Sequence, residues 1–173
     1  MDKHNAVLDA SFWINAHRSG LVDYLLDYFD LVVPAQVMHE IEYMPPDVGQ
    51  LTPAGETFRR WREEGRLKFQ DPATPVDWFH PGENAAIGLA QELRCVLLMD
   101  DQAPYHLAKL RGLRAVASTD FTVLLYVDRR LSYNEAAATL VSSEIARHLK
   151  RAALTALQFL AQQSSEKDDN TIS

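Results

Sequence analysis

Short apolar runs that end at an acidic residue alternate with longer segments of helical pattern along most of this chain. The run Asn5–Asp9 ends in its own acid, and the run Cys95–Met99 is followed directly by Asp100. Runs this short are typical of strands buried on both faces, and a helix between two such strands allows them to lie parallel. The sequence therefore predicts an α/β fold of three layers, with helices on both faces of a short, mostly parallel central sheet.

The expected elements follow from apolar periodicity and from the positions of glycine, proline and capping residues. Strands are expected at Asn5–Asp9, Leu31–Val33, Leu67–Phe69, Cys95–Met99 and Ala115–Ala117. Helices are expected at 12–29 with a break near Gly20, at 34–42, 52–64, 82–93, 102–111 and 121–130, and from 132 to 163 with an interruption. We expect a main domain at 1–131, a helical extension at 132–163 packed on it, and a disordered polar tail at 164–173.

The composition limits the classes of function. The 173 residues suffice for one domain with a short appendage, and 17 Lys and Arg against 24 Asp and Glu give a net charge of −7. A negative chain is unusual for a nucleic-acid binder, unless the acids gather in one site or a basic partner covers them. The single cysteine, Cys95, excludes an internal disulfide and a zinc cluster. Because no signal pattern and no apolar run of about 18 residues is present, a cytoplasmic protein without a membrane segment is expected.

Several acids directly follow predicted strands. Asp9 ends the first strand, Asp100 and Asp101 follow the fourth, and Thr119 and Asp120 follow the fifth. Since the carboxyl ends of parallel strands meet at one edge of a sheet, we expect these side chains to converge. Two like charges about 4 Å apart repel by roughly 4 kcal/mol at an effective dielectric constant of 20, so such a cluster takes up protons or binds a cation. Carboxylate ligands favour Mg²⁺ or Mn²⁺, which suits the hydrolysis of phosphate esters.

Each of these acids also has a purely structural interpretation, because Asp is a good helix cap. Asp9 is either a ligand or a cap, and Ser11 either caps the same helix or donates a hydrogen bond that holds Asp9. Asp100 is expected to point into the site, whereas Asp101 is interpreted as the cap of its helix. Asp120 is either a cap or a further acid of the site.

Four motifs resemble those of the PIN-domain family, in the family's order and spacing, over about residues 5–130. They are Val7–Ser11, Val33–Ile41, Pro81–Ala90 and Leu97–Ala108, similar to the family's opening D-x-[ST] strand, P-x-x-V-x-x-E-[IL] helix, G-E-x-x-A-I-x-L-A helix and L-x-D-D segment. The resemblance implies a PIN-like fold, and the most similar sub-group is that of compact prokaryotic VapC-like proteins.

This resemblance implies a divalent-metal-dependent endoribonuclease that hydrolyses RNA phosphodiesters, in the role of the toxin of a toxin–antitoxin pair. The family's metal-binding acids fall on Asp9, Glu40, Glu83 and Asp100, which would hold one or two Mg²⁺ or Mn²⁺ ions. Thr119 matches the position whose hydroxyl supports the metal's water, and Asp120 is a fifth acid of the implied catalytic set. RNA is the implied substrate, and an antitoxin protein and a second copy of the chain are the implied partners.

Departures from the family pattern keep a second interpretation open. Ser118–Phe121 stands where the family has G-T-x-G, and Gln102 stands where a basic residue often follows the Asp pair. The alternative is a catalytically weak or inactive PIN-like module that binds RNA or a protein partner. A small-molecule phosphohydrolase with Asp9 as its nucleophile is disfavoured, because the residue two places later is Ser11 rather than an acid.

Two basic clusters are candidates for RNA contact. The first surrounds Trp61, and the second follows the predicted Asp100 site; together they comprise Arg59, Arg60, Arg62, Arg66, Lys68, Lys109, Arg111 and Arg114. Basic side chains attract phosphates and an aromatic ring can stack on an unpaired base. For the first cluster, a solvated helix face is the stronger interpretation.

Overall fold

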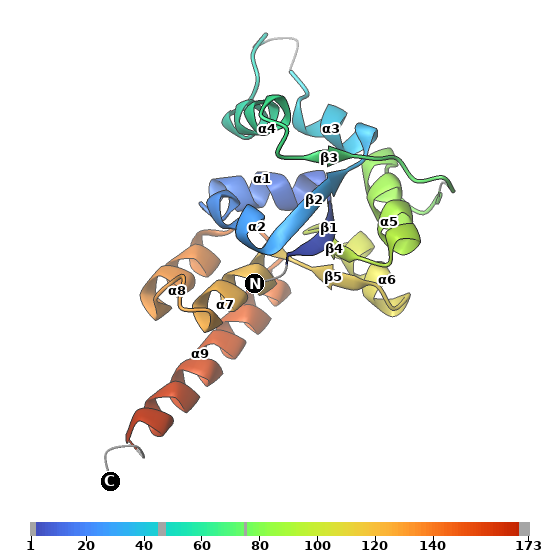
Figure 1. Ribbon diagram of the computed structural model, residues 1–173. Helices are drawn as coiled ribbons and strands as arrows, with labels where there is room; N and C mark the ends of the chain where they lie inside the picture. The colour runs from blue at the N-terminus through green and yellow to red at the C-terminus, as the bar shows by residue number, and fades with distance from the viewer. Residues whose placement is uncertain (1–2, 45–47, 75, 170–173) are drawn as a thin grey trace. The chain divides into compact units, whose positions relative to one another are not determined.

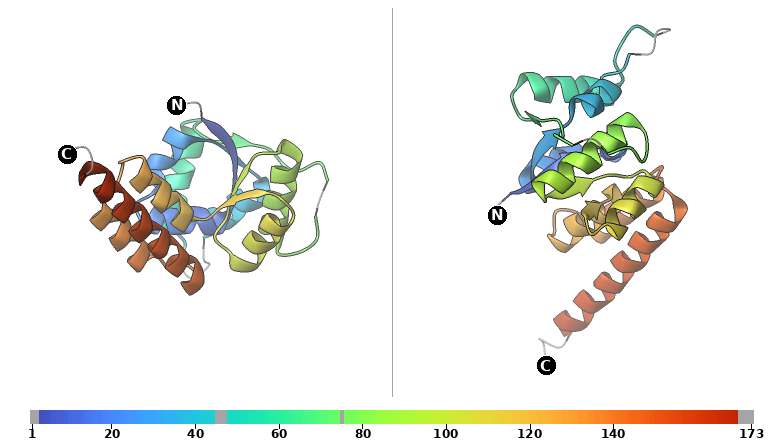
Figure 2. Two further views of the ribbon diagram at one scale, coloured as in Figure 1. Left: turned by 90° about the horizontal axis from the view of Figure 1, so that it is seen from below. Right: turned by 90° about the vertical axis from the view of Figure 1, so that its right-hand side faces the viewer.

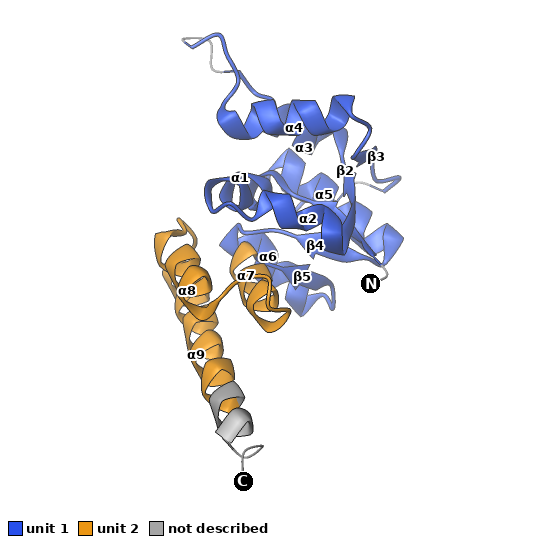
Figure 3. Cartoon of the chain, turned by 60° about the vertical axis from the view of Figure 1, so that its left-hand side comes forward, with its two compact units in different colours: residues 1–117 blue, residues 118–173 orange. Residues whose placement is uncertain are grey.

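The computed structural model of the chain describes the backbone of residues 3–44, 48–74 and 76–169, and the side chains of those up to 163. The chain divides into two compact units, residues 1–117 and 118–173 (Figure 3). The first unit contains a β-sheet with its covering helices, and the second unit is helical.

Within the described residues, five short strands form one parallel sheet in the order β3-β2-β1-β4-β5 (Figure 1). The strands are β1 (His4–Leu8), β2 (Phe29–Val33), β3 (Lys68–Phe69), β4 (Val96–Leu98) and β5 (Arg114–Val116). In the central strand, Ala6 lies opposite Leu31 on one side and Val96 on the other. From β1 the chain builds the sheet outward on one side, through β2 and β3. It then returns to the other side of β1, where it adds β4 and β5. A topological switch point therefore lies between β1 and β4, where parallel sheets commonly bind ligands.

The helices of the first unit cover both faces of this sheet. They are α1 (Ala10–Arg18), α2 (Val22–Tyr28), α3 (Ala35–Ile41), α4 (Pro53–Glu63), α5 (Pro81–Leu93) and α6 (Gln102–Leu110). Helices α1 and α2 lie on one side of the sheet, and α5 and α6 lie on the other (Figures 1 and 2). This arrangement buries the strands on both faces, which explains why the runs in the sequence are almost entirely apolar.

An aromatic cluster holds α4 against α1. The ring of Trp13 lies 5.3 Å from that of Phe58 and 5.2 Å from that of Trp61, both edge-on. The indole N–H of Trp13 donates to the carbonyl oxygen of Ala54 over 3.0 Å. Since buried aromatic side chains contribute large apolar areas, this cluster fixes α4 against α1 within the first unit.

The second unit consists of α7 (Ser118–Val127), α8 (Tyr133–Ser142) and α9 (Arg147–Asp169). Helix α8 begins with the capping box that the sequence predicts: the Ser132 hydroxyl accepts from the Glu135 N–H, and the Glu135 carboxylate accepts from the Ser132 N–H. A buried core cluster of the second unit is made of Ala136, Leu140, Ala153 and Leu157. No helix in the described part of the chain combines the length and the apolar character needed to cross a bilayer.

The predicted α/β class and the parallel sheet are confirmed, with differences at element ends. Helix α7 begins at Ser118 rather than at 121, so Thr119 and Asp120 lie in its first turn. The two compact units divide at 117/118, because α7 packs against α8 and α9, and the domain boundary expected at 131/132 stays a prediction. Helix α9 continues to Asp169, beyond the predicted end at Gln163, and the expected disorder of the polar tail stays a prediction. The rest of the predicted tail, 170–173, lies outside the described residues.

Candidate active site

A cavity of about 340 Å³ in the first unit collects acidic side chains from distant parts of the chain. It is bounded by the residues that follow β1, by α3, by the start of α5 and by the residues that follow β4. The lining residues are Asp9, Ala10, Ser11, Glu40, His80, Pro81, Glu83 and Asp101. Half of these residues are carboxylic acids, and they face the cavity next to the switch point of the sheet.

Asp9 is buried at the end of β1 and caps helix α1. Its Oδ2 accepts from the Ser11 N–H over 2.9 Å and also from the Ser11 hydroxyl. The same hydroxyl oxygen accepts the N–H groups of Asp100 and Asp101, over 3.1 and 3.2 Å. Ser11 therefore links the residues after β1 to those after β4, and it is the donor that holds the Asp9 carboxylate.

Glu40 projects from α3 toward the start of α5. Its Oε1 accepts from the Gly82 N–H over 3.1 Å. A Cβ added at Gly82 would overlap both carboxylate oxygens of Glu40, so only glycine leaves room for this contact. Gly82 thus positions one acid of the cavity by lacking a side chain.

Glu83 and Asp101 meet at the starts of α5 and α6. Glu83 is the third residue of α5, and its Oε2 accepts from the His80 N–H over 3.0 Å. Asp101 is one of the groups that raise the pKa of Glu83. Asp101 occupies the N-cap position of α6 but makes no side-chain capping bond, so the interpretation of its carboxylate as a cap is wrong.

The crowding of acids changes their affinity for protons. Burial raises the pKa of Asp9 from 3.8 to about 7; the bonds from Ser11 lower it, and the charges of Asp101 and Glu40 raise it further. Burial also raises the pKa of Glu83; the His80 N–H lowers it, and the hydrogen bond to Asp101 raises it. A cavity that favours protonated carboxyl groups is also one in which a cation would be stabilised.

The sequence of the chain matches the family model DUF3368, described as a PIN domain, over residues 5–158. The chain belongs to the PIN-domain family. No curated protein matches it closely. A solved domain of a functionally unknown protein from Methanocaldococcus jannaschii DSM 2661 shares 22% identity over 66% of this chain and 90% of that chain, with a TM-score of 0.49. A PilT N-terminus domain protein from Sulfolobus solfataricus P2 shares 18% identity over 65% and 86%, with a TM-score of 0.37.

PIN domains are generally nucleases. Three of the predicted site residues, Asp100, Thr119 and Asp120, are not among the residues that line the cavity. Asp100 is 5% exposed, and its Oδ2 accepts from the Asn15 side-chain amide over 2.9 Å. It is Asp101, rather than Asp100, that lines the cavity. Thr119 and Asp120 belong to the second unit; the Thr119 hydroxyl is buried and has no hydrogen-bond partner among the described residues, and Asp120 is exposed.

Two ionisable residues of the cavity wall were not predicted as site residues from the sequence: His80 and Asp101. Each stands immediately before a helix, at a position normally interpreted as a cap. The signal for His80 was its place just ahead of the Pro81–Ala90 motif, and that for Asp101 was its adjacency to Asp100.

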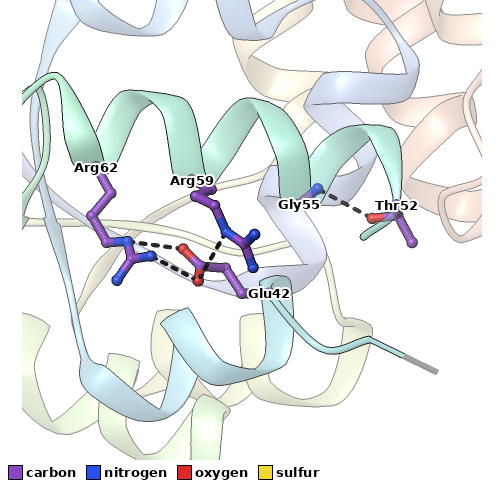
Figure 4. Close-up of polar contacts among 5 residues, drawn as sticks. All are labelled: Glu42, Thr52, Gly55, Arg59 and Arg62. Carbon is purple, nitrogen blue, oxygen red and sulfur yellow. Dashed lines mark hydrogen bonds and ion pairs between the residues drawn. The ribbon is translucent and has the colours of Figure 1, made fainter. Parts of the chain in front are cut away.

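The first basic cluster of this PIN domain is largely engaged within the protein (Figure 4). The Arg62 guanidinium lies 3.0 Å from the Glu42 carboxylate, and that of Arg59 lies 3.9 Å from it. The ring of Trp61 is 2% exposed and packs on Trp13, which leaves it no open face to stack on an RNA base. In the second cluster, the Arg111 guanidinium stacks on Trp78.

Replacing Gly82 with alanine should weaken any activity of the carboxylate cavity without unfolding the protein. The new methyl group displaces the Glu40 carboxylate, and we expect about a 10- to 100-fold loss of any such activity. Stability should change little, because alanine favours the helix by up to about 1 kcal/mol. Gly20→Ala is the opposite control: at a φ of 69° with open space around it, it should cost about 1 kcal/mol of stability and leave the rate unchanged. Rate assays and thermal unfolding of both variants decide; equal rates in Gly82→Ala and the parent would exclude this role of Glu40.

Proposed function

We propose that this PIN domain is an endoribonuclease that hydrolyses RNA phosphodiesters with one or two bound Mg²⁺ or Mn²⁺ ions. The observation that supports it most strongly is the meeting of Asp9, Glu40, Glu83 and Asp101 at one cavity beside the switch point of the sheet. Carboxylate oxygens are the ligands that hard divalent cations prefer. Gly82 also supports a metal site, because it leaves a space beside the Glu40 carboxylate that the side chain of any larger residue would fill.

In this proposal Asp9, Glu40, Glu83 and Asp101 hold the cation. A bound divalent ion supplies charge stabilisation for the phosphate and lowers the pKa of a water nucleophile. Ser11 keeps the Asp9 carboxylate in place, and Glu83, whose pKa is raised by burial, would hold the cation in its deprotonated form. Asp100 accepts a hydrogen bond from the Asn15 side chain and is not given a ligand role in this proposal, and the roles of Thr119 and Asp120 stay predictions.

The present side-chain positions require a rearrangement on binding. Among the described residues, no group of three or more His, Cys, Asp or Glu side chains is arranged to hold a metal ion. Each acid is instead engaged elsewhere: Asp9 with Ser11, Glu40 with Gly82 and Glu83 with His80. Like charges brought together by such a rearrangement would repel one another, and a bound cation would offset that repulsion.

The deciding experiment is an RNA cleavage assay with the full chain. Single-stranded RNA should be cut with Mg²⁺ or Mn²⁺, remain intact with a chelator, and be cut again when metal is restored. An Asp9→Asn protein purified in the same way controls for contaminating ribonucleases. Cleavage that persists in the chelator, or that is equal in the variant, would refute the proposal.

Because these acids are not arranged to hold a metal ion in the present structure, a second function is also a candidate: a PIN-like module that binds RNA or a protein partner without cutting RNA. In the same assay, RNA that is bound but stays intact with every divalent ion would support this second function. The toxin role, an antitoxin partner and a homodimer rest on the resemblance to VapC-like proteins. A small protein encoded beside this one that suppresses its activity would support them.

A further inference from the structure

A second cavity adjoins the carboxylate cavity, and the two share Glu40. It has a volume of about 380 Å³ and is lined by Gln36, His39, Glu40 and Tyr43. Gln36, His39 and Glu40 lie on one face of α3, because residues three and four positions apart are neighbours on a helix. Tyr43 follows the end of α3 and completes the wall. A group in this cavity would therefore lie directly beside a phosphate at the acids.

The aromatic ring in this wall is exposed, unlike those of the core. Tyr43 is 59% exposed, whereas Trp13, Phe58 and Trp61 are almost fully buried. Within the described part of the chain, the Tyr43 ring has no stacking or cation–π contact. An open aromatic face at a cavity is suited to stack on a flat ring.

The remaining wall offers hydrogen-bonding groups without positive charge. The Gln36 amide both donates and accepts, and the His39 imidazole can do either. Neither side chain is hydrogen bonded to another described residue. Because none of the four lining residues is Lys or Arg, the cavity suits a neutral ring with polar edges better than a phosphate.

We propose that this cavity binds an unpaired RNA base next to the phosphate that is cut, with Tyr43 stacking on the base and Gln36 and His39 hydrogen bonding to its edge. The identity of the ligand as RNA rests on the proposed function. Bases in a duplex are stacked on their neighbours and are not free to enter such a cavity, so the substrate class is single-stranded RNA.

The test measures RNA binding rather than cleavage, in an Asp9→Asn background that leaves the RNA intact. The probe is a fluorescein-labelled single-stranded RNA of mixed sequence, about 12 nucleotides long, followed by fluorescence anisotropy. Adding Tyr43→Ala should weaken binding about 5- to 100-fold, as expected for the loss of one stacked base. Tyr43→Phe keeps the ring and should bind within about threefold of the background protein. Phe159→Ala removes an aromatic ring that is similarly exposed, at 58%, and should have no effect.

Either of two results would overturn the base-binding site: unchanged affinity in Tyr43→Ala, or an equal loss in Tyr43→Phe. Failure of the background protein to bind the probe would overturn it as well. The outcome is separable from the proposed function. If RNA is cut by the parent but Tyr43 has no effect, only the base site fails; if Tyr43 governs binding but no metal supports cleavage, only the nuclease fails.

Discussion

Asp9→Asn is expected to reduce RNA cleavage about a thousandfold or more while making the metal-free protein more stable at pH 8. The loss of rate follows from removing a buried anionic ligand at the centre of the acid cluster, where charge stabilisation is most effective. The gain in stability follows from the raised pKa of Asp9. Ionising a buried carboxylate lowers stability when no cation is bound, and the nearby charges of Asp101 and Glu40 add to this effect.

The pH dependence of this gain has a defined sign. In the unfolded chain Asp9 ionises near 3.8, and in the folded protein near 7. The stability that the protonated form contributes is complete below pH 3.8 and is lost as the pH rises through 7. Asparagine does not titrate, so the difference in unfolding free energy between variant and parent should grow by roughly 2–3 kcal/mol from pH 5 to pH 8.

Chemical denaturation of both proteins across this pH range, with a chelator present, measures the difference. Asp77→Asn makes the same chemical change at an exposed position outside the cavity and should show neither effect. A constant difference between Asp9→Asn and the parent across the range would mean that Asp9 stays ionised in the folded protein and that burial does not raise its pKa as described.

The adjacent variants Asp101→Asn and Asp100→Asn are expected to separate catalysis from stability. Asp101 lines the cavity and is exposed, so its variant should lose about a hundredfold or more in rate and keep its stability within about 0.5 kcal/mol. Asp100 is buried and bonded to Asn15. Its variant should lose about 1–3 kcal/mol of stability and at most about tenfold in rate.

The two substitutions control each other, because they make the same chemical change at neighbouring positions. Rates measured with saturating Mn²⁺ and unfolding curves of the same preparations give both quantities. A larger loss of rate in Asp100→Asn would show that Asp100 is the ligand, as the sequence motif suggested, and that Asp101 turns away when the cation binds.

The sequence was informative wherever one local pattern had one physical solution. The strand cores, the break near Gly20 and the capping box at Ser132 follow from local preferences that the tertiary structure supports. Element ends were less predictable: the start of α7 at Ser118 depends on packing within the second unit, which no local pattern describes.

The sequence predicted at which edge of the sheet the site lies, but not which of two neighbouring acids lines it. The positions of Asp9 and Glu83 after a strand and at a helix start were readable from the motifs. The choice between Asp100 and Asp101 was not, because it depends on the Ser11 hydroxyl, which accepts both backbone N–H groups and fixes the turn between β4 and α6. The burial of Trp61 depended on its packing against Trp13, a residue 48 positions earlier in the chain.

Calorimetric titration of Mn²⁺ into the full chain at about pH 8 tests most directly whether the acidic cavity is a metal site. Saturable binding is predicted, accompanied by proton release and weakened at least about tenfold in Asp9→Asn. An absence of saturable binding by the parent, or equal affinity in the variant, would contradict the assignment of Asp9, Glu40, Glu83 and Asp101 to a metal-dependent active site.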